Sequence, residues 1–87
     1  MKKTIYDFAQ NKINSGEYPK AEILLKELIE QNNKDFAALK GLAYVYLAQS
    51  KYADSIPIIN LAISLEAESS ELFYFLALAN FNIGLIK

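Results

Sequence analysis

The feature that most constrains the fold of this chain is an internal repeat with a period of 34 residues, set by Tyr18 and Tyr52. Residues of similar size recur at that spacing through the rest of the chain. The matched sets are Ile5, Leu39 and Phe73; Phe8, Leu42 and Leu76; Ala9, Ala43 and Ala77; Gly16, Ser50 and Gly84; Ala21 and Ser55; and Leu25 and Ile59. A period of this length predicts stacked structural units that bury their apolar faces only against their neighbours.

Hydrophobic spacing inside each unit predicts a pair of packed helices. Apolar residues follow the i, i+3, i+4, i+7 rule of an amphipathic helix at Leu39, Leu42, Ala43 and Tyr46. The second helix of the preceding unit shows the same kind of spacing at Leu25, Leu28 and Ile29. Alanine is expected where two helix backbones approach closely, which predicts helix contacts at Ala9, Ala43 and Ala77.

Capping and turn residues divide the chain into five predicted helices. Gly16 and the residues before it break the chain ahead of Pro19, which suits the first turn of a helix. Asp35 is predicted to cap the third helix, and Ser69 or Ser70 the fifth. Pro57 predicts a kink, not a break, in the fourth helix. The predicted helices span about 4–15, 19–32, 36–50, 53–66 and 70 onward.

These residues resemble the tetratricopeptide repeat (TPR) family over nearly the whole chain. The family pattern is matched best by Leu39, Leu42, Ala43, Tyr46, Ser50, Tyr52, Ser55, Ile59 and Ala62. The chain departs from it at Lys12, Leu28, Asn33 and Ala67. The resemblance implies an all-α superhelix of about five antiparallel helices in one domain over 1–87. Its repeats cover about 2–35 and 36–69, with a half repeat over 70–87.

Composition argues against catalysis and against several classes of partner. The chain has no Cys and no His, which removes disulfides, thiolate metal sites and the commonest general base. We therefore expect a cytoplasmic protein that is not an enzyme and holds no cofactor or metal. The net charge of −1 disfavours nucleic acid. The acids Glu22, Glu27 and Glu30 beside Lys26 indicate ordinary surface pairing along one helix.

The last predicted helix carries no charge from Leu72 to Ile86. This stretch is shorter than the roughly 18 to 20 residues of a membrane span, so we expect a packed helix. A helix that is apolar all round requires cover on every side, and the repeat pattern supplies no sixth helix to provide it. An exposed apolar edge, covered by another chain or a second copy, is predicted at Leu72, Phe73, Phe75, Leu76, Ile83, Leu85 and Ile86.

In the TPR family, the ligand lies in a concave groove lined by the first helix of each repeat. The resemblance places the matching positions at Tyr6, Gln10, Ile13, Lys40, Tyr44, Leu47, Tyr74, Leu78 and Phe81. Aromatic and aliphatic side chains favour an amphipathic helix or apolar segment as ligand. Alternatively, several of the tyrosines pack between helices. Family members that grip acidic C-termini use cationic groove residues, but the matching positions here are Tyr6, Gln10, Gly41, Glu71 and Phe75.

The functional expectation is a protein-interaction module that acts as a small chaperone or adaptor. By analogy it is similar to the small TPR chaperones of bacterial type III secretion, which often work with a second small co-chaperone. A bias toward Lys, Asn and Ile is compatible with a bacterial source. The alternative is a self-associating TPR scaffold, such as a homodimer, or a part of a longer TPR solenoid. An enzyme is the remaining class, and no acid, base or nucleophile constellation favours it.

Overall fold

The computed structural model describes residues 4–86, with the side chains of residues 4–84. These residues form five α-helices and no β-strand, which confirms the predicted all-α fold. The helices are α1 (Ile5–Asn14), α2 (Tyr18–Gln31), α3 (Phe36–Ala48), α4 (Tyr52–Leu65) and α5 (Ser70–Ile86). Their observed ends lie within two residues of the predicted ones.

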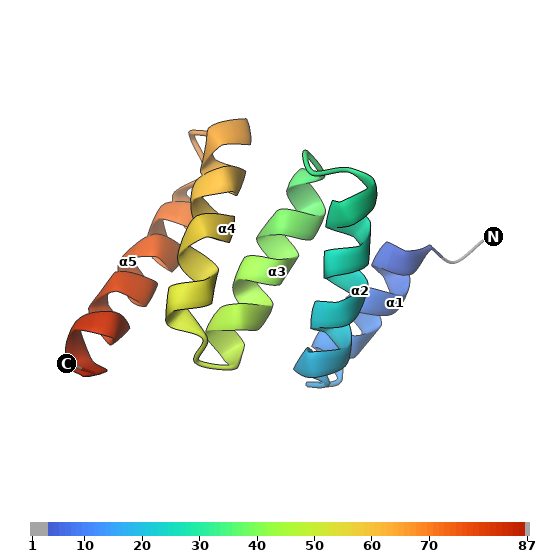
Figure 1. The fold of residues 1–87 in the computed structure, drawn as a ribbon, viewed down its shortest axis with the longest axis horizontal. Helices are drawn as coiled ribbons and strands as arrows, with labels where there is room; N and C mark the ends of the chain where they lie inside the picture. The colour runs from blue at the N-terminus through green and yellow to red at the C-terminus, as the bar shows by residue number, and fades with distance from the viewer. Residues whose placement is uncertain (1–3, 87) are drawn as a thin grey trace.

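The helices form a row of antiparallel neighbours that follows the order of the chain (Figure 1). Each helix packs against the next one in sequence, and α3 also touches α5. The row measures 45 × 26 × 20 Å, so it is elongated along the direction in which the helices succeed one another. Consequently α1 and α5 form the two ends of the row, and each has one side that no other described helix covers.

Local chemistry accounts for where the helices begin. The side chains and backbones of Thr4 and Asp7 bond reciprocally at the start of α1, which satisfies amide groups that have no partner inside the helix. Asp35 accepts a hydrogen bond from the Ala38 amide at 3.0 Å, as predicted. At α5 the Ser69 hydroxyl accepts from the Leu72 amide at 3.4 Å. Helix α4 continues unbroken through Pro57.

The turn position of the repeat differs between the three units. Gly16 has a φ of +78° and Ser50 a φ of +61°, so both lie in the left-handed conformation that ends a helix. The matching Gly84 is helical instead, because α5 runs on to Ile86. The third unit therefore lacks the turn that the first two use to start a second helix.

The core consists of two apolar clusters that share α3. The first joins α1, α2 and α3 around Leu25 and Leu42, and the second joins α3, α4 and α5 around Leu39, Ile59 and Leu72. These five side chains are at most 2% exposed. Burial of a Leu or Ile side chain contributes about 1.5–3 kcal/mol, so the two clusters account for much of the stability.

The prediction of alanine contacts holds for the first two units and is wrong for the third. Ala9 and Ala43 are completely buried, whereas Ala77 is exposed. Helix α5 docks on α4 through Ala79 and the residues on its side, so Ala77 points toward the uncovered side. A close contact at this repeat position requires the helix that follows, and no described helix follows α5.

Candidate functional site

One groove of about 490 Å³ runs across the three odd-numbered helices. Its lining comes from α1, α3 and α5, which shows that these three helices share one side of the row. The lining residues are Tyr6, Gln10, Ile13 and Asn14 of α1; Phe36, Ala37, Lys40, Gly41 and Tyr44 of α3; and Glu71 and Phe75 of α5. The aromatic members come from all three helices, so the groove presents ring surface along its length.

Tyr44 lines this groove and contacts two other aromatic rings, Phe75 within the groove and Tyr18 outside it. Its ring centroid is 6.3 Å from that of Tyr18 in an edge-on arrangement and 6.4 Å from that of Phe75. A hydrogen bond with Tyr44 raises the pKa of the Tyr18 hydroxyl above its ordinary value. Tyr44 is nevertheless 43% exposed. The contacts hold its ring in place while much of its surface stays open to a ligand, at little further entropic cost.

Polar groups of the groove are paired with one another. Lys40 forms an ion pair with Glu71, which links α3 to α5. The Gln10 amide donates a hydrogen bond to the Asn14 side-chain oxygen at 3.1 Å. Both pairs are partly open to solvent, so they add little stability by themselves. The pairs matter more for ligand recognition. A charged ligand could form an ion pair with Lys40 or Glu71 only by breaking the ion pair between them.

The structure brings five of the nine predicted groove residues together. Tyr6, Gln10, Ile13, Lys40 and Tyr44 line the groove. The other four lie elsewhere: Leu47 packs beside the second core cluster, Leu78 is half-buried, and Tyr74 and Phe81 are exposed on α5, outside the groove lining. The groove thus occupies the end of α5 that contains Glu71 and Phe75.

Sequence reasoning missed Asn14, Phe36 and Ala37 as groove residues. Phe36 stands four residues before Lys40, which in turn stands four before Tyr44, so all three share one face of α3. That spacing was visible in the sequence. Gly41, Glu71 and Phe75 were considered as positions of a carboxylate clamp, and Phe75 also as part of the exposed edge of α5, but none was predicted as a groove residue; all three line the groove.

The predicted edge of α5 divides into a buried part and an exposed part. Leu72 is 0% and Phe75 7% exposed, so their assignment to an open edge is wrong. Both belong to the apolar cluster that joins α5 to α4 and α3. Phe73 is 49% exposed and Leu76 is half-buried. Ile83 is also half-buried, and the side chains of the remaining two, Leu85 and Ile86, lie outside the described residues.

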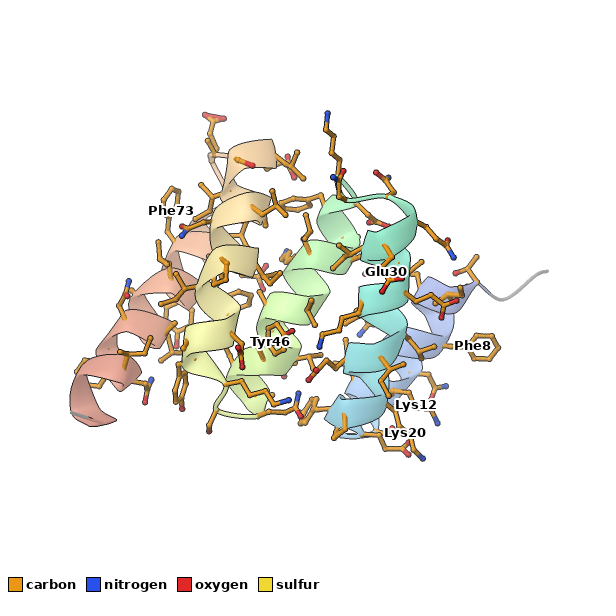
Figure 2. All side chains as sticks on the ribbon, in the orientation of Figure 1. Phe8, Lys12, Lys20, Glu30, Tyr46 and Phe73 are labelled. Carbon is orange, nitrogen blue, oxygen red and sulfur yellow. The ribbon has the colours of Figure 1, made fainter. Side chains whose placement is uncertain are left out.

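A polar cluster on the other side of the row joins the first two repeats. The Glu22 carboxylate accepts from Gln49 at 2.9 Å and from Lys51 at 3.0 Å, and it pairs with Lys26 at 2.9 Å. The pKa of Glu22 is lowered to about 2, mainly by the hydrogen bond to Lys26 and further by those to Lys51 and Gln49. Partial burial of the carboxylate acts in the opposite direction and is outweighed. The ammonium groups of Lys26 and Lys51 lie within 6 Å of the Tyr46 ring centroid. Figure 2 marks the position of Tyr46 on α3. Glu22 is therefore an inter-repeat bridge and not only the surface pair that was expected.

The turn between α1 and α2 carries a second, more exposed polar cluster. Glu17 pairs with Lys20 at 2.9 Å and with Lys12 at 3.4 Å, and accepts a hydrogen bond from Ser15 at 2.9 Å. Hydrogen bonds from Lys20, Ser15 and Lys12, in that order, lower the pKa of Glu17 to about 2. Lys12 occupies the repeat position of Tyr46, so this cluster uses charge where the second repeat uses an aromatic ring.

Neither a metal centre nor a membrane-spanning helix is found in the part of the chain that the structure describes. Within residues 4–86, no three side chains of the kinds that bind metals come together as a possible metal site. Over the same residues, no helix combines the length and the apolar character that a membrane crossing requires.

Comparison with known proteins adds no relative. No protein-family model, no curated protein and no solved structure matches the chain.

Proposed function

We propose that this chain is a protein-interaction module of the TPR type. It binds an amphipathic helix or an apolar segment of another protein in the groove between α1, α3 and α5. The observation that carries this proposal is the groove itself, an aromatic surface from three helices whose charged and amide side chains are paired with one another. Its aromatic residues are Tyr6, Phe36, Tyr44 and Phe75.

The chemistry of the groove favours an uncharged ligand face. Aromatic rings supply broad contact area with few rotatable bonds, and such residues dominate the binding energy of protein interfaces. A helix that lays apolar side chains into a groove makes this kind of contact. Lys40 and Glu71 then lie where the polar flank of such a helix would pass, and their pairing avoids the cost of a buried unpaired charge.

An acidic C-terminus is a poor ligand for this groove. Lys40 is the only cationic residue among the lining side chains, and it already forms an ion pair with Glu71. A carboxylate entering the groove would either lose its water without a cationic partner or displace Glu71. The carboxylate-clamp function that some TPR proteins perform is therefore excluded from the proposal.

A narrower form of the proposal is a small chaperone of type III secretion. It rests on the family resemblance and on the apolar character of the groove. Such a chaperone would keep an aggregation-prone helical subunit in solution. Its test is whether the chain suppresses light scattering by such a subunit at equimolar concentration, compared with the Tyr44→Ala variant.

The broader proposal is tested by peptide binding. The probe is a fluorescein-labelled, designed 18-residue helix with Leu and Phe on one face and Ser, Glu and Lys on the other, and fluorescence anisotropy measures its affinity. We expect saturable binding that weakens at least tenfold in Tyr44→Ala, because truncation of a central anchor costs about 2 kcal/mol or more. A scrambled peptide of identical composition should bind at least tenfold more weakly.

The matched control is Ile23→Ala. Ile23 is 67% exposed on α2, away from the groove, so its truncation removes apolar surface without touching the lining. We expect its affinity for the helix to stay within twofold of the parent chain. Equal losses in Tyr44→Ala and Ile23→Ala, or equal binding of the scrambled peptide, would contradict a specific groove.

A further inference from the structure

The α5 end of the groove continues into a recess of about 340 Å³ between the start of α3 and the turn from α4 to α5. Figure 1 shows this turn at the upper ends of α4 and α5. Glu66 and Glu68 of the turn line the recess, and the groove and the recess share Phe36 and Lys40. Because the two hollows share these walls, a ligand that leaves the groove at this end passes into the recess.

The recess is acidic, whereas the opposite end of the groove is uncharged. Glu66 and Glu68 are exposed, and neither forms an ion pair with another described side chain. Lys40, the only cationic residue of the recess lining, is already paired with Glu71. The α1 wall of the groove consists of the uncharged residues Tyr6, Gln10, Ile13 and Asn14. A ligand lying along the groove therefore meets uncharged surface at one end and two carboxylates at the other.

The equivalent turn one repeat earlier has no acid at the matching positions. The residues 34 positions before Glu66, Glu68 and Glu71 are Asn32, Lys34 and Ala37. The two turns, over 32–35 and 66–69, have the same length and connect successive helices in the same way. Neutral or cationic residues at these three positions are therefore compatible with the turn. The fold does not require the acids, so their presence beside the groove needs another reason.

Glu66 also occupies a position where a carboxylate is unfavourable for the free chain. It caps the C-terminal end of α4, and its amide donates a hydrogen bond to the Ala62 carbonyl. This end of a helix carries a partial negative charge, which repels a carboxylate. No basic residue lies in the last turn of α4 to offset the repulsion. Departures from local rules of this kind are expected at functional sites, and a cationic ligand would relieve this one.

We propose that the partner of this groove is an amphipathic helix flanked by Lys or Arg residues, which pair with Glu66 and Glu68. This inference rests on the proposed function, and it adds the charge of the ligand and its placement. The apolar face of the helix lies against the aromatic rings of the groove. Its basic flank passes over the ion pair between Lys40 and Glu71 into the recess. That pair stays intact, so neither of its charges loses a partner when the ligand covers it.

The exposure of the two acids sets the size of the expected preference. An ion pair between exposed groups contributes at most roughly fivefold to an affinity. Exchanging attraction for repulsion at both carboxylates should therefore change the affinity at least about fivefold at low salt. Salt screens such exposed charges, so the preference should disappear at high ionic strength while the apolar contacts remain.

Fluorescence anisotropy with three forms of the designed 18-residue helix tests the proposal. Each form carries two added residues at both ends, which are Lys, Glu or Ser, so one pair reaches the recess whichever way the helix lies. At about 20 mM NaCl, the lysine form should bind at least fivefold more tightly than the glutamate form, with the serine form between them. At about 1 M NaCl, the three affinities should agree within twofold.

Charge reversal locates the preference on the chain. The double variant Glu66→Lys/Glu68→Lys should bind the glutamate form more tightly than the lysine form at low salt. The matched control is Glu27→Lys/Glu30→Lys, which changes the net charge equally. Both of its residues are exposed on α2, outside the lining of the groove and of the recess, so it should still prefer the lysine form. Circular dichroism of both double variants verifies that they fold.

Three outcomes would overturn the proposal. Equal affinities of the three forms at low salt would refute the basic flank and leave peptide binding in the groove standing. An equal loss of preference in the two double variants would mean that the net charge of the chain, and not the recess, selects the ligand. An absence of saturable binding by all three forms would overturn the proposed function together with this inference.

Discussion

The two ends of the helical row are built from the same repeat and differ in polarity. At the α1 end the outward positions hold Thr4, Asp7 and Asn11, and all three are exposed. At the α5 end the outward stripe holds Phe73 and Ala77, also exposed but apolar. A solvent-facing end of a repeat array normally requires a polar surface. The α1 end has one apart from the exposed Phe8, whereas the outward stripe of α5 holds no charged residue. The comparison shows that repeat position alone does not determine burial, because burial depends on whether a neighbouring helix is present.

The largest expected effect separates the buried and exposed sides of α5. Leu72→Ala should lower the free energy of unfolding by about 2–5 kcal/mol, because it leaves a cavity beside α4. Phe73→Ala should change it by at most about 0.5 kcal/mol, since Phe73 is half-exposed. Urea unfolding followed by circular dichroism measures both. Comparable losses at the two positions would mean that α5 packs differently.

A second prediction compares alanines at one repeat position. Ala43→Leu should destabilise the fold by about 1–3 kcal/mol, because a larger side chain cannot fit between α3 and α4. Ala77→Leu, in the same position of α5, should have an effect within about 0.5 kcal/mol. Thermal unfolding of dilute samples distinguishes them. If Ala77→Leu were as costly as Ala43→Leu, a helix would have to cover the α5 stripe within one molecule.

The third comparison is between the two junctions that join consecutive repeats, and concerns how the stability that each contributes depends on pH. Glu22 and Gln49 bond at the first junction, while the residues 34 positions later are Ile56 and Ile83, both half-buried. The pKa of Glu22 is lowered from 4.5 to about 2 in the folded chain. Because the folded pKa lies below the unfolded one, this stabilisation is complete above pH 4.5 and is lost as the pH falls toward 2.

Glu22→Gln tests the contribution of the first junction. The substitution should lower the free energy of unfolding at pH 7 by about 1–2 kcal/mol, because hydrogen bonds to a charged group are lost. It should also flatten the dependence of the urea midpoint between pH 4.5 and about 2, the interval between the pKa of Glu22 in the unfolded chain and its pKa in the folded chain. The pKa of Glu17 is also lowered to about 2, but its partners lie at the more exposed turn between α1 and α2. Glu17→Gln is therefore the comparison variant, and it should flatten the pH dependence less than Glu22→Gln does. An unchanged pH dependence in Glu22→Gln would mean that the bridge contributes nothing.

The smallest expected effect concerns the turn position of the repeat. Ser50 is left-handed at a φ of +61°, so Ser50→Gly should stabilise the fold by about 0.5 kcal/mol. The equivalent Gly84 is helical with open space around it, so Gly84→Ala should also stabilise, by about 0.5 kcal/mol. Introducing a glycine at position 50 and removing one at the equivalent position 84 would thus both raise the free energy of unfolding. A loss of stability in Gly84→Ala would show that the third unit turns at Gly84 as the others do.

The sequence was sufficient to predict the helices and most of the core. Helix boundaries follow local rules, such as the Asp35 cap and the turn at Gly16, and these rules hold whatever surrounds the segment. Ala77 shows where such rules fail, because its burial depends on a neighbouring helix, which the first two units have and which no described residues supply to the third. Leu72 was misassigned for a related reason: in a uniformly apolar helix, periodicity cannot indicate which side faces the core.

The groove was predictable only in part. Positions transferred from the family located its α1 and α3 walls, including Tyr6 and Tyr44. The α5 wall is formed by Glu71 and Phe75, one turn nearer the start of that helix than most of the positions transferred to it. The Glu22 bridge could not be inferred from helix spacing, because its partners Gln49 and Lys51 are 27 and 29 residues away along the chain.

The central claim is that α1, α3 and α5 together form a peptide-binding surface. Chemical-shift mapping by NMR tests it most directly, with the ¹⁵N-labelled chain and the designed amphipathic helix as the probe. We predict saturable shifts at the amides of Tyr6, Tyr44 and Phe75, with α2 and the outward face of α4 unaffected. Shifts concentrated on α2 and α4, or no shifts at millimolar peptide, would contradict the claim.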